Sequence, residues 1–543
     1  MFVGSLKKIN LSTSIFERLI TKGQFYVDKT RFIEHFLDEA SDVQLVTRQR
    51  RLGKSLNMDT LHCFLTDRQD NRHLFKGLYI EKSHVWSEAN SAPVFKFDFK
   101  KLINDGYKEQ VRRYAKQSLT HYLKHSGTDY SSIIESAAAT ESLYILTEAV
   151  YEITGKRSYI LIDEYDKLLI DNHRSEKYEE IRDFIGALFS AVLKDNQYLE
   201  KALLTGVMRV SKESIFSNLN NISVFDIFSD DIYTDSYGFT EKEIQHIGEH
   251  EVIDIDEARK WYNGIRVNGV PIYNTYSFSS YLRWKQFECF WAMSGSMDIV
   301  AKLLTDGRRK VIARLLSGSE ARVPFSVRIS LHDLKDEAAD EAFYSLIAQT
   351  GYVTVIGCVN SADSFANIAI PNTELMIVWK KFILTNLYPK PTRLVTLFDN
   401  ANDIELFKSD LEYFLSDRLS YFDLAVRAGD TKRSTEERLY HIFVLGLLSA
   451  YKDASCKFPL SNRESGDGRY DILVEKPDAN FIFELKASDT TEGLKEISNT
   501  ALRQIDEKRY GVDFDSTKRL VKIGIAFCGK SCWVEIGGGK YEQ

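Results

Sequence analysis

The sequence "VQLVTRQRRLGKSLNMDTLHCFL", residues 43–65, determines how the first part of the chain folds. It begins with a β-rich apolar run, continues as a polar loop and ends in a segment with apolar residues at helical spacing between Leu56 and Leu65. A strand, a loop and a helix in this order bind phosphate through backbone N–H groups and the positive end of the helix. The loop fits the pattern G-x-x-x-x-G-K-[ST] except at its first position, which is Arg48.

A second stretch, "GIAFCGKS" at residues 524–531, fits the same pattern at every position. The residues between its two glycines continue an apolar strand, and another β-rich run follows where a phosphate site needs a helix. We therefore predict a β-hairpin at this stretch and place the phosphate loop at residues 48–55.

The loop at residues 48–55 carries the side chains that nucleotide chemistry needs. In this pattern the lysine, here Lys54, contacts the β- and γ-phosphates of ATP, and the hydroxyl of Ser55 binds Mg²⁺. A basic turn before a surface helix is the alternative interpretation when the stretch is considered alone.

A second motif, "SYILIDEYD" at residues 158–166, favours the nucleotide site. It predicts an apolar strand that ends in adjacent carboxylates, where Asp163 is expected to hold Mg²⁺ and Glu164 to polarise the attacking water. The alternative is a buried strand that runs into an acidic loop. A third strand-like run, "KALLTGVMRVS", carries Thr205 and Arg209 at its end, where polar side chains could sense the γ-phosphate.

The pattern along the chain predicts three regions. In the first region, residues 1–240, strand-like and helical stretches alternate from about Val43 to Asp235, which indicates a parallel α/β sheet of the nucleotide-binding type. Residues 241–388 are mostly helical and predict a lid and bridging region. Two prolines in "YPKPT" mark a boundary, and residues 395–543 predict a small α/β domain with a hairpin at its centre.

The composition limits the classes of function. In 543 residues, 44% hydrophobic and 27% charged, no apolar run reaches the roughly 20 residues of a membrane span, and the start of the chain has no signal-peptide pattern. We expect a soluble protein with no membrane partner, cytoplasmic or, in a eukaryote, nuclear. The six scattered cysteines form no C-x-x-C pair and fit reduced thiols. The net charge of −7 argues against a broad nucleic-acid coat but allows a local basic groove.

A second cluster lies in "GRYDILVEKPDANFIFELKAS", residues 468–488. Glu484 and Lys486 alternate along one strand and so share a face, and a hairpin can bring Asp471 beside them, while Phe483 and Leu485 face the core. Carboxylates that hold Mg²⁺ and a lysine that stabilises hydroxide are the groups that phosphodiester cleavage needs. An amphipathic hairpin with one exposed ion pair is the alternative interpretation.

These stretches together resemble the AAA-ATPase-like proteins that carry a C-terminal nuclease domain of the PD-(D/E)XK superfamily. The matching segments in the first part are "FYVDKT", "LVTRQRRLGKSLNM", "ILIDEYDKLL", "LLTGVMRVSKESIFSNLNN", "YGFTEKEI", "WYNGIRV" and "IYNTYSF". In the last part they are "EERLYHIFVLGLLSAY", "SNRESGDGRYDIL", "FIFELKA" and "ALRQIDEKRY". The loop of that family also has arginine at the position of Arg48, whereas Gln49 and Leu52 depart from the proline and phenylalanine often found there.

The resemblance implies a P-loop ATPase with an AAA-like sheet and a nuclease domain, with ATP and Mg²⁺ as cofactors and nucleic acid, in the first instance DNA, as partner. It also allows a homo-oligomer, in which Arg209 is the candidate for the arginine that AAA-type ATPases receive from a neighbouring subunit. The implied nucleotide-binding residues are Arg48, Arg50, Arg51, Gly53, Lys54, Ser55 and Asp163. The implied metal ligands are Ser55, Asp163, Glu437, Asp471 and Glu484, and Gln504 with Tyr510 borders the second site. Glu437 also suits a first helical turn, where it could act only as a cap.

The leading hypothesis is a protein that binds and hydrolyses ATP and couples this to Mg²⁺-dependent cleavage of phosphodiester bonds, in which Asp471, Glu484, Lys486 and Glu164 are catalytic. The alternative is a nucleotide-switched regulatory protein whose C-terminal domain binds nucleic acid or protein without cutting, which the net acidity favours. A degenerate remnant with neither activity is a third possibility. The sequence does not distinguish DNA from RNA, because neither an aromatic stacking array nor a groove-reading helix stands out.

Overall fold

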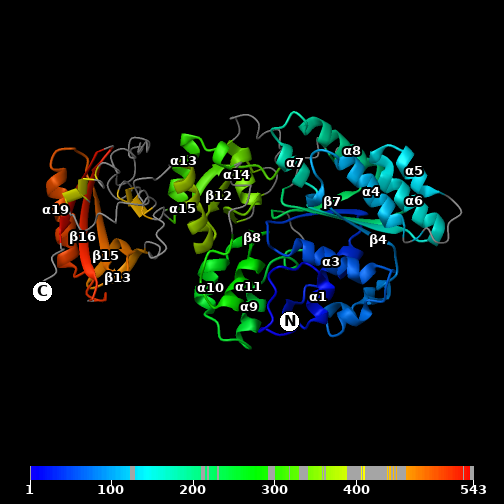
Figure 1. The fold of residues 1–543 in the computed structure, drawn as a ribbon, viewed down its shortest axis with the longest axis horizontal. Coiled ribbons are helices and arrows are strands. Elements are labelled where there is room, and N and C mark those ends of the chain that lie inside the picture. Colours follow the sequence, from blue (N-terminus) through cyan, green and yellow to red (C-terminus); the bar gives the residue numbers. More distant parts are fainter. Residues whose placement is uncertain are drawn as a thin grey trace. The chain divides into compact units, whose positions relative to one another are not determined.

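The protein is described by a computed structural model in which two compact units are distinguished (Figure 1). Unit 1 comprises Met1–Leu303 and Glu320–Leu375, and unit 2 comprises Leu304–Ser319 and Met376–Gln543. The described residues are 2–120, 122, 129–208, 215–216, 219–228, 232–291, 300–316, 318–328, 340–357, 359, 363–387, 460–515, 517–529, 531–537 and single positions between 405 and 448. Arg209 and the "YPKPT" boundary lie outside them, and the three predicted regions remain a prediction.

Unit 1 is built on a five-stranded sheet in which every neighbouring pair is parallel. The strand order is β4-β5-β6-β3-β7. The strands are β3 (Val43–Thr47), β4 (Val94–Asp98), β5 (Ser158–Asp163), β6 (Leu199–Gly206) and β7 (Ile222–Phe225). The predicted parallel α/β sheet is thereby confirmed. Because β6 lies between β3 and β5, the ends of the three candidate nucleotide strands are neighbours.

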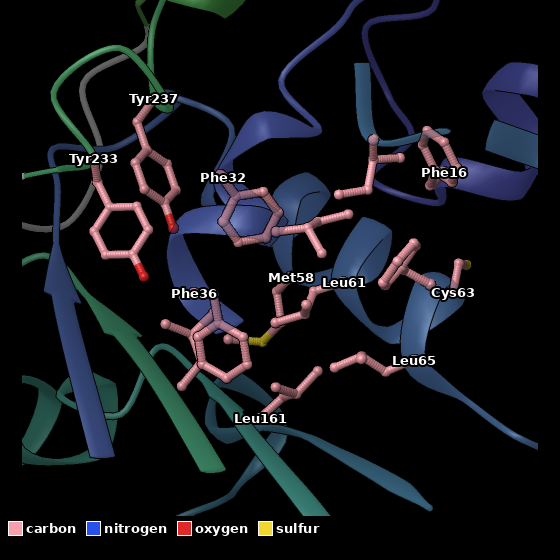
Figure 2. Packing of buried hydrophobic residues seen from close by; sticks show 14 of the residues in the cluster. Phe16, Phe32, Phe36, Met58, Leu61, Cys63, Leu65, Leu161, Tyr233 and Tyr237 are labelled. Carbon is pink, nitrogen blue, oxygen red and sulfur yellow. The ribbon is translucent and has the colours of Figure 1, made fainter. Parts of the chain in front are cut away.

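Helices cover the sheet of unit 1 on both faces, so β3 and β5 are buried along their whole length (Figure 1). On one face, Figure 2 shows Met58, Leu61 and Leu65 of α3 (Lys54–Leu65) packed near Phe36 and Leu161. The helices in the first half of the unit are α1 (Phe16–Thr21), α2 (Arg31–Asp38), α4 (Tyr107–Leu119), α5 (Tyr130–Ser136), α6 (Ser142–Thr154), α7 (Lys167–Asn172) and α8 (Tyr178–Leu193).

The rest of unit 1 is mainly helical with short strands. Its helices are α9 (Glu241–Gly248), α10 (Ile255–Tyr262), α11 (Thr275–Trp284), α14 (Asp340–Gln349) and the start of α15 (Thr373–Leu387). Two antiparallel strand pairs, β1 (Phe2–Val3) with β2 (Tyr26–Val27) and β8 (Ile265–Val267) with β9 (Val270–Ile272), accompany a small sheet. That sheet has the order β10 (Ala321–Pro324), β12 (Phe365–Ala369) and β11 (Thr354–Ile356).

Unit 2 contains a second five-stranded sheet in the order β13-β14-β15-β16-β17, together with α13 (Asp306–Leu316). The strands are β13 (Leu460–Ser465), β14 (Gly468–Glu475), β15 (Ala479–Ala487), β16 (Arg519–Cys528) and β17 (Ser531–Gly537). All pairs are antiparallel except β15 with β16, whose connection contains α19 (Leu494–Glu507). None of the described helices has both the length and the apolarity needed to cross a membrane.

The packing in unit 2 confirms two predictions from the sequence. Phe483 and Leu485 lie in a core cluster with Val444, whereas Ile482 on the other face of β15 packs against Ile505 of α19. The "GIAFCGKS" stretch joins β16 to β17 as an antiparallel hairpin. It therefore lacks the helix that a phosphate loop requires.

Candidate functional site

The loop between β3 and α3 leads directly into the helix through Gly53, whose φ of 93° lies in the left-handed region. No side chain caps the first turn of α3, so backbone N–H groups of that turn are available to an anion. A cavity of about 830 Å³ opens beside the loop, and Arg50, Arg51, Lys54 and Ser55 are among the residues that line it. Shape and dipole therefore suit a bound polyphosphate.

Lys54 is buried, and its ammonium group donates to the carbonyl oxygens of Arg48 and Gln49 at 2.8 Å each. An ammonium has three N–H groups, so these contacts hold it in place and leave one N–H for a phosphate oxygen. Burial lowers the pKa of Lys54 to about 8, against the opposing effect of Asp163 and Asp166. A bound phosphate would restore the charge by direct pairing.

Asp163, at the C-terminal end of β5, joins the three strand ends. Its Oδ2 accepts a hydrogen bond from Ser55 Oγ at 2.5 Å, and its Oδ1 accepts one from Thr205 Oγ1 at 2.6 Å. Residues 108 positions apart in the sequence are thus in contact. A serine hydroxyl and a carboxylate are the hard oxygen donors that Mg²⁺ prefers, so this donor set fits the metal that the sequence implies.

Glu164 and Asp166 follow at the edge of the same cavity. Burial raises the pKa of the Glu164 carboxyl, while Lys100 opposes the shift. Asp166, which the sequence analysis did not assign, is buried and accepts hydrogen bonds from the N–H groups of Val207 and Met208, both at 2.8 Å. It therefore fixes the end of β6 next to Thr205, and its signal in the sequence was the last carboxylate of "DEYD".

Arg48 has a different place from the one expected of a nucleotide ligand. Its N–H donates to Gly206 O, which continues the β3–β6 pairing, and its side chain turns away from the cavity and is completely buried. The guanidinium donates to Thr47 O at 2.8 Å and Phe225 O at 2.9 Å, with its carbon 5.4 Å from the centre of the Tyr237 ring. The Arg48 side chain thus binds backbone carbonyl groups in the interior instead of a phosphate, which corrects its assignment as a nucleotide-binding residue.

Replacing Arg48 by alanine is expected to destabilise unit 1 by about 2–4 kcal/mol, because two charged hydrogen bonds are lost and two buried carbonyl groups are left without this donor. Urea unfolding followed by tryptophan fluorescence measures the effect. The control is Arg182→Ala, since Arg182 is paired only at the surface, with Glu179 and Asp183. Equal midpoints for the two variants would contradict a supporting role for Arg48.

The loop is also held from α11, a contact that the sequence analysis missed. Thr275 Oγ1 donates to Arg51 O at 2.6 Å, and Asn274 Nδ2 donates to Arg50 O at 3.3 Å. Arg51 has a positive φ of 64°, and its guanidinium carbon lies 4.1 Å from the ring centre of Tyr276. The signal in the sequence was the segment "IYNTYSF", whose polar residues begin this helix.

In unit 2 the structure brings Asp471, Glu484 and Lys486 together, as the hairpin predicted. Asp471 Oδ2 accepts a hydrogen bond from Leu485 N at 2.8 Å, and Lys486 Nζ lies 3.6 Å from Glu484 Oε1. Gln504 of α19 donates to the same Oε1. Glu484 is only 3% exposed, so the site is a buried charged cluster rather than the exposed ion pair of the alternative interpretation.

The second carboxylate oxygen of Glu484 has no hydrogen-bond donor among the described residues. This oxygen, Oε2, is also buried. Burial and the adjacent Asp471 raise the pKa of the Glu484 carboxyl, and burial likewise raises that of Asp471. Two buried carboxylates with an unpaired oxygen suit a divalent cation, which would supply the missing positive charge.

Two further residues frame this site. Glu437 Oε1 accepts a hydrogen bond from Ala487 N at 3.4 Å, which places Glu437 beside the end of β15 and next to Lys486. Burial raises the pKa of Tyr510, which packs in the cluster with Ile482. His441, which the sequence analysis did not assign, has a ring nitrogen 2.9 Å from Asp471 O, and its signal was a polar residue inside the apolar segment "LYHIF".

Two family models match the parts of the chain that contain these two sites. Residues 10–216 match a family model described as a predicted AAA-ATPase, and residues 435–536 match the PD-(D/E)XK nuclease superfamily. The chain joins an AAA-ATPase-like domain to a PD-(D/E)XK nuclease-superfamily domain. Lys54 and Asp163 lie within the first match, and Glu437, Asp471, Glu484 and Lys486 lie within the second.

Two similar proteins extend the comparison. An uncharacterized protein in the vnfD 5′ region of Azotobacter chroococcum mcd 1 is 28% identical over 524 residues, which is 93% of each chain. The Walker-type ATPase paby2304 of Pyrococcus abyssi is similar over 65% of this chain and 94% of its own, with 15% identity and a TM-score of 0.33. The AAA-ATPase-like domain brings a lysine, a hydroxyl and carboxylates to one cavity, and the nuclease-superfamily domain brings carboxylates and a lysine together.

Proposed function

We propose that this protein hydrolyses ATP in its AAA-ATPase-like domain and, in its C-terminal domain, cleaves phosphodiester bonds of nucleic acid with a divalent metal, in the first instance Mg²⁺ and DNA. The observation that carries the proposal is the buried Glu484 Oε2, which has no described donor, on a carboxylate whose Oε1 lies 3.6 Å from Lys486 Nζ and whose pKa is raised by burial and by Asp471. A domain that only bound a partner would gain nothing from keeping two carboxylates buried side by side.

In the C-terminal domain, Asp471 and Glu484, with Glu437 nearby, would hold the metal. When bound, the metal supplies Lewis acidity and lowers the pKa of a water molecule that attacks phosphorus. Leu485 N fixes the orientation of Asp471, and Gln504 fixes Glu484 so that its Oε2 remains available. Lys486 Nζ stabilises the negative charge that develops on the phosphate oxygens.

In the ATPase domain, the N–H groups at the start of α3 and the Lys54 ammonium bind phosphate oxygens, while Ser55 and Asp163 would hold Mg²⁺. Mg²⁺, when bound, neutralises charge on the β- and γ-phosphates. Glu164 lines the cavity and accepts a proton from the attacking water at its carboxylate. Thr205 keeps Asp163 in position through its hydrogen bond to Oδ1.

The test is a cleavage assay with supercoiled plasmid, single-stranded DNA and RNA, with and without ATP. We expect cutting in Mg²⁺, none in EDTA, and about 10²-fold slower cutting by Lys486→Ala, the usual cost of losing one preorganised charge. Lys522→Ala is the matched control, because Lys522 is also 26% exposed and also paired with a carboxylate, Asp506. Full activity of Lys486→Ala, or no cutting of any substrate by the unmodified protein, would contradict the proposal.

A further inference from the structure

Lys100 follows the carboxyl end of β4, the edge strand of the sheet in unit 1. Asp98, the last residue of β4, is in register with Asp163, the last residue of β5. Neighbouring strands of a sheet lie about 4.8 Å apart, so the segments that follow Asp98 and Asp163 start from adjacent positions. Lys100 therefore leaves the sheet beside Glu164, the residue that follows Asp163.

A short 3₁₀ turn, η4 (Phe99–Lys101), fixes the backbone of Lys100. Its N–H donates to the carboxylate of Asp98 at 3.1 Å. The ring of Phe99 is buried and stacks on Phe189, with 5.9 Å between the ring centres. The turn is thus anchored on both sides of Lys100, and only the lysine side chain remains exposed and free to move.

The side chain of Lys100 lines the same cavity of about 830 Å³ as the phosphate loop and Glu164. It makes no hydrogen bond or ion pair with any residue that the structure describes. The other lysines of the cavity lining are engaged: Lys29 with Glu243, Lys54 with the loop carbonyls, and Lys167 with Asp171. Lys100 is therefore the lysine of this cavity that has all three N–H groups available to a ligand.

The positive charge of Lys100 also acts on Glu164. Among the charged groups around this carboxyl, Lys100 lowers its pKa the most, more than Lys54 does. Electrostatic effects fall with distance, so the Lys100 ammonium lies near the carboxylate that faces the attacking water in the proposed reaction.

We propose that Lys100 is a catalytic residue of ATP hydrolysis and binds the γ-phosphoryl oxygens in the transition state; the inference rests on the proposed function. In this step the water oxygen bonds to the γ-phosphorus, and the bond from that phosphorus to the bridging oxygen breaks. The electron pair of the broken bond leaves with ADP, and the proton of the water passes to Glu164. Negative charge is spread over the γ-phosphoryl oxygens while this happens, and an ammonium beside Glu164 faces that charge.

The two lysines of the cavity would then have different roles. Lys54 is held in place by carbonyl oxygens and binds the phosphates of the resting nucleotide. Lys100 has no fixed partner, so water competes for it until charge develops on the transferred group. P-loop NTPases commonly use such a second cation, from the same chain or from a neighbour. Loss of Lys100 is therefore expected to lower the rate more than the affinity for ATP.

The experiment uses the full-length protein and compares Lys100→Met with Lys101→Met. Methionine keeps an unbranched side chain of similar length without the charge. Lys101 is a matched control, because it is the next residue of the same turn, is 82% exposed, pairs with Asp98 at 3.7 Å and does not line the cavity. Phosphate release from Mg²⁺-ATP gives kcat and KM. The affinity for fluorescently labelled ADP is measured with and without aluminium fluoride, which takes the place of the transferred phosphoryl group.

We expect kcat of Lys100→Met to fall by about 10²-fold, the usual cost of one preorganised charge, with KM within about threefold of the unmodified protein. The affinity for ADP alone should not change, whereas the affinity for ADP with aluminium fluoride should fall by about the same 10²-fold. Lys101→Met should match the unmodified protein in all three measurements. The melting temperature of both variants should be unchanged, because neither side chain is buried.

The assignment of Lys100 would be overturned by equal kcat values for the two variants, or by equal losses of affinity for ADP with and without aluminium fluoride. If the unmodified protein releases no phosphate from ATP, the proposed function fails as well. If Lys54→Ala stops hydrolysis and Lys100→Met does not slow it, only the role of Lys100 fails.

Discussion

ATP hydrolysis is expected to fall by about 10²- to 10³-fold when Lys54 is replaced by alanine, measured as phosphate release in Mg²⁺-ATP. Lys54 is held at the phosphate loop by the carbonyl oxygens of Arg48 and Gln49, and in this type of loop the lysine contacts the β- and γ-phosphates. The fold should survive, because the lost ammonium is a buried charge beside an open cavity that water can enter. The nuclease activity of the Lys54→Ala protein, compared with that of the unmodified protein with and without ATP, then shows whether cleavage depends on ATP hydrolysis.

The control for Lys54→Ala is Lys201→Ala. Lys201 lies near the start of β6, whereas the phosphate loop lies beyond the other end of these strands. Lys201 donates to Glu39 O. Its loss should leave phosphate release within about twofold of the unmodified protein, since surface substitutions away from a site usually change little. Similar rates for the two variants would exclude the assigned phosphate loop.

The pH dependence of nucleotide affinity gives an independent check on the same lysine. The charged form of Lys54 binds phosphate, and in the free protein its pKa is lowered to about 8. Above pH 8 the free protein therefore loses a proton that binding must restore, and affinity should fall by up to about tenfold per pH unit. In Lys54→Arg the charge persists over this range, so its affinity should not depend on pH there. An equal pH dependence for both proteins would contradict the assignment.

Replacing Glu484 by glutamine is expected to have two opposite effects. Metal-dependent cleavage should fall by about 10³-fold, because several kcal/mol of metal-derived stabilisation is lost with the ligand. In EDTA, however, the variant should melt at a higher temperature, since burial and Asp471 raise the pKa of Glu484 to about 8 in the folded protein, which costs stability at neutral pH that glutamine does not cost. Each kcal/mol regained corresponds to about 2–4 °C for a domain of this size.

Glutamine suits this test because it is isosteric and can still accept the hydrogen bond from Gln504 at Oε1. The control is Glu496→Gln on α19, where the carboxylate is 79% exposed and only Arg503 is paired with it. Neither rate nor melting temperature should change in that variant. A Glu484→Gln protein that cuts normally, or that melts earlier than the unmodified protein in EDTA, would show that Glu484 is a structural carboxylate.

Short-range patterns predicted the parts of both sites that local geometry controls. Lys54 and Ser55 follow a strand and open a helix, and their place in the structure follows from that order alone. The alternation of Glu484 and Lys486 along β15 likewise fixed their common face. The sequence also predicted that "GIAFCGKS" is a hairpin and not a phosphate loop, because an apolar strand without a following helix cannot build a phosphate site.

Contacts between distant segments could not be predicted in the same way. The side chain of Arg48 turns toward Phe225, 177 positions away, and no local rule gives that direction. The hydrogen bond from Thr275 Oγ1 to Arg51 O joins residues that are 224 positions apart.

The buried arginine beneath the phosphate loop also couples the loop to positions far from it in the sequence. Arg48 shares one buried site with Tyr237 and the backbone of Phe225, so a substitution at one of these positions alters the free-energy cost of substitutions at the others. Glycine at position 48 would leave a void where the arginine side chain lies, unless a larger ring stood at position 237. Substitutions at positions 48 and 237 are therefore expected to be non-additive in their effect on the stability of unit 1.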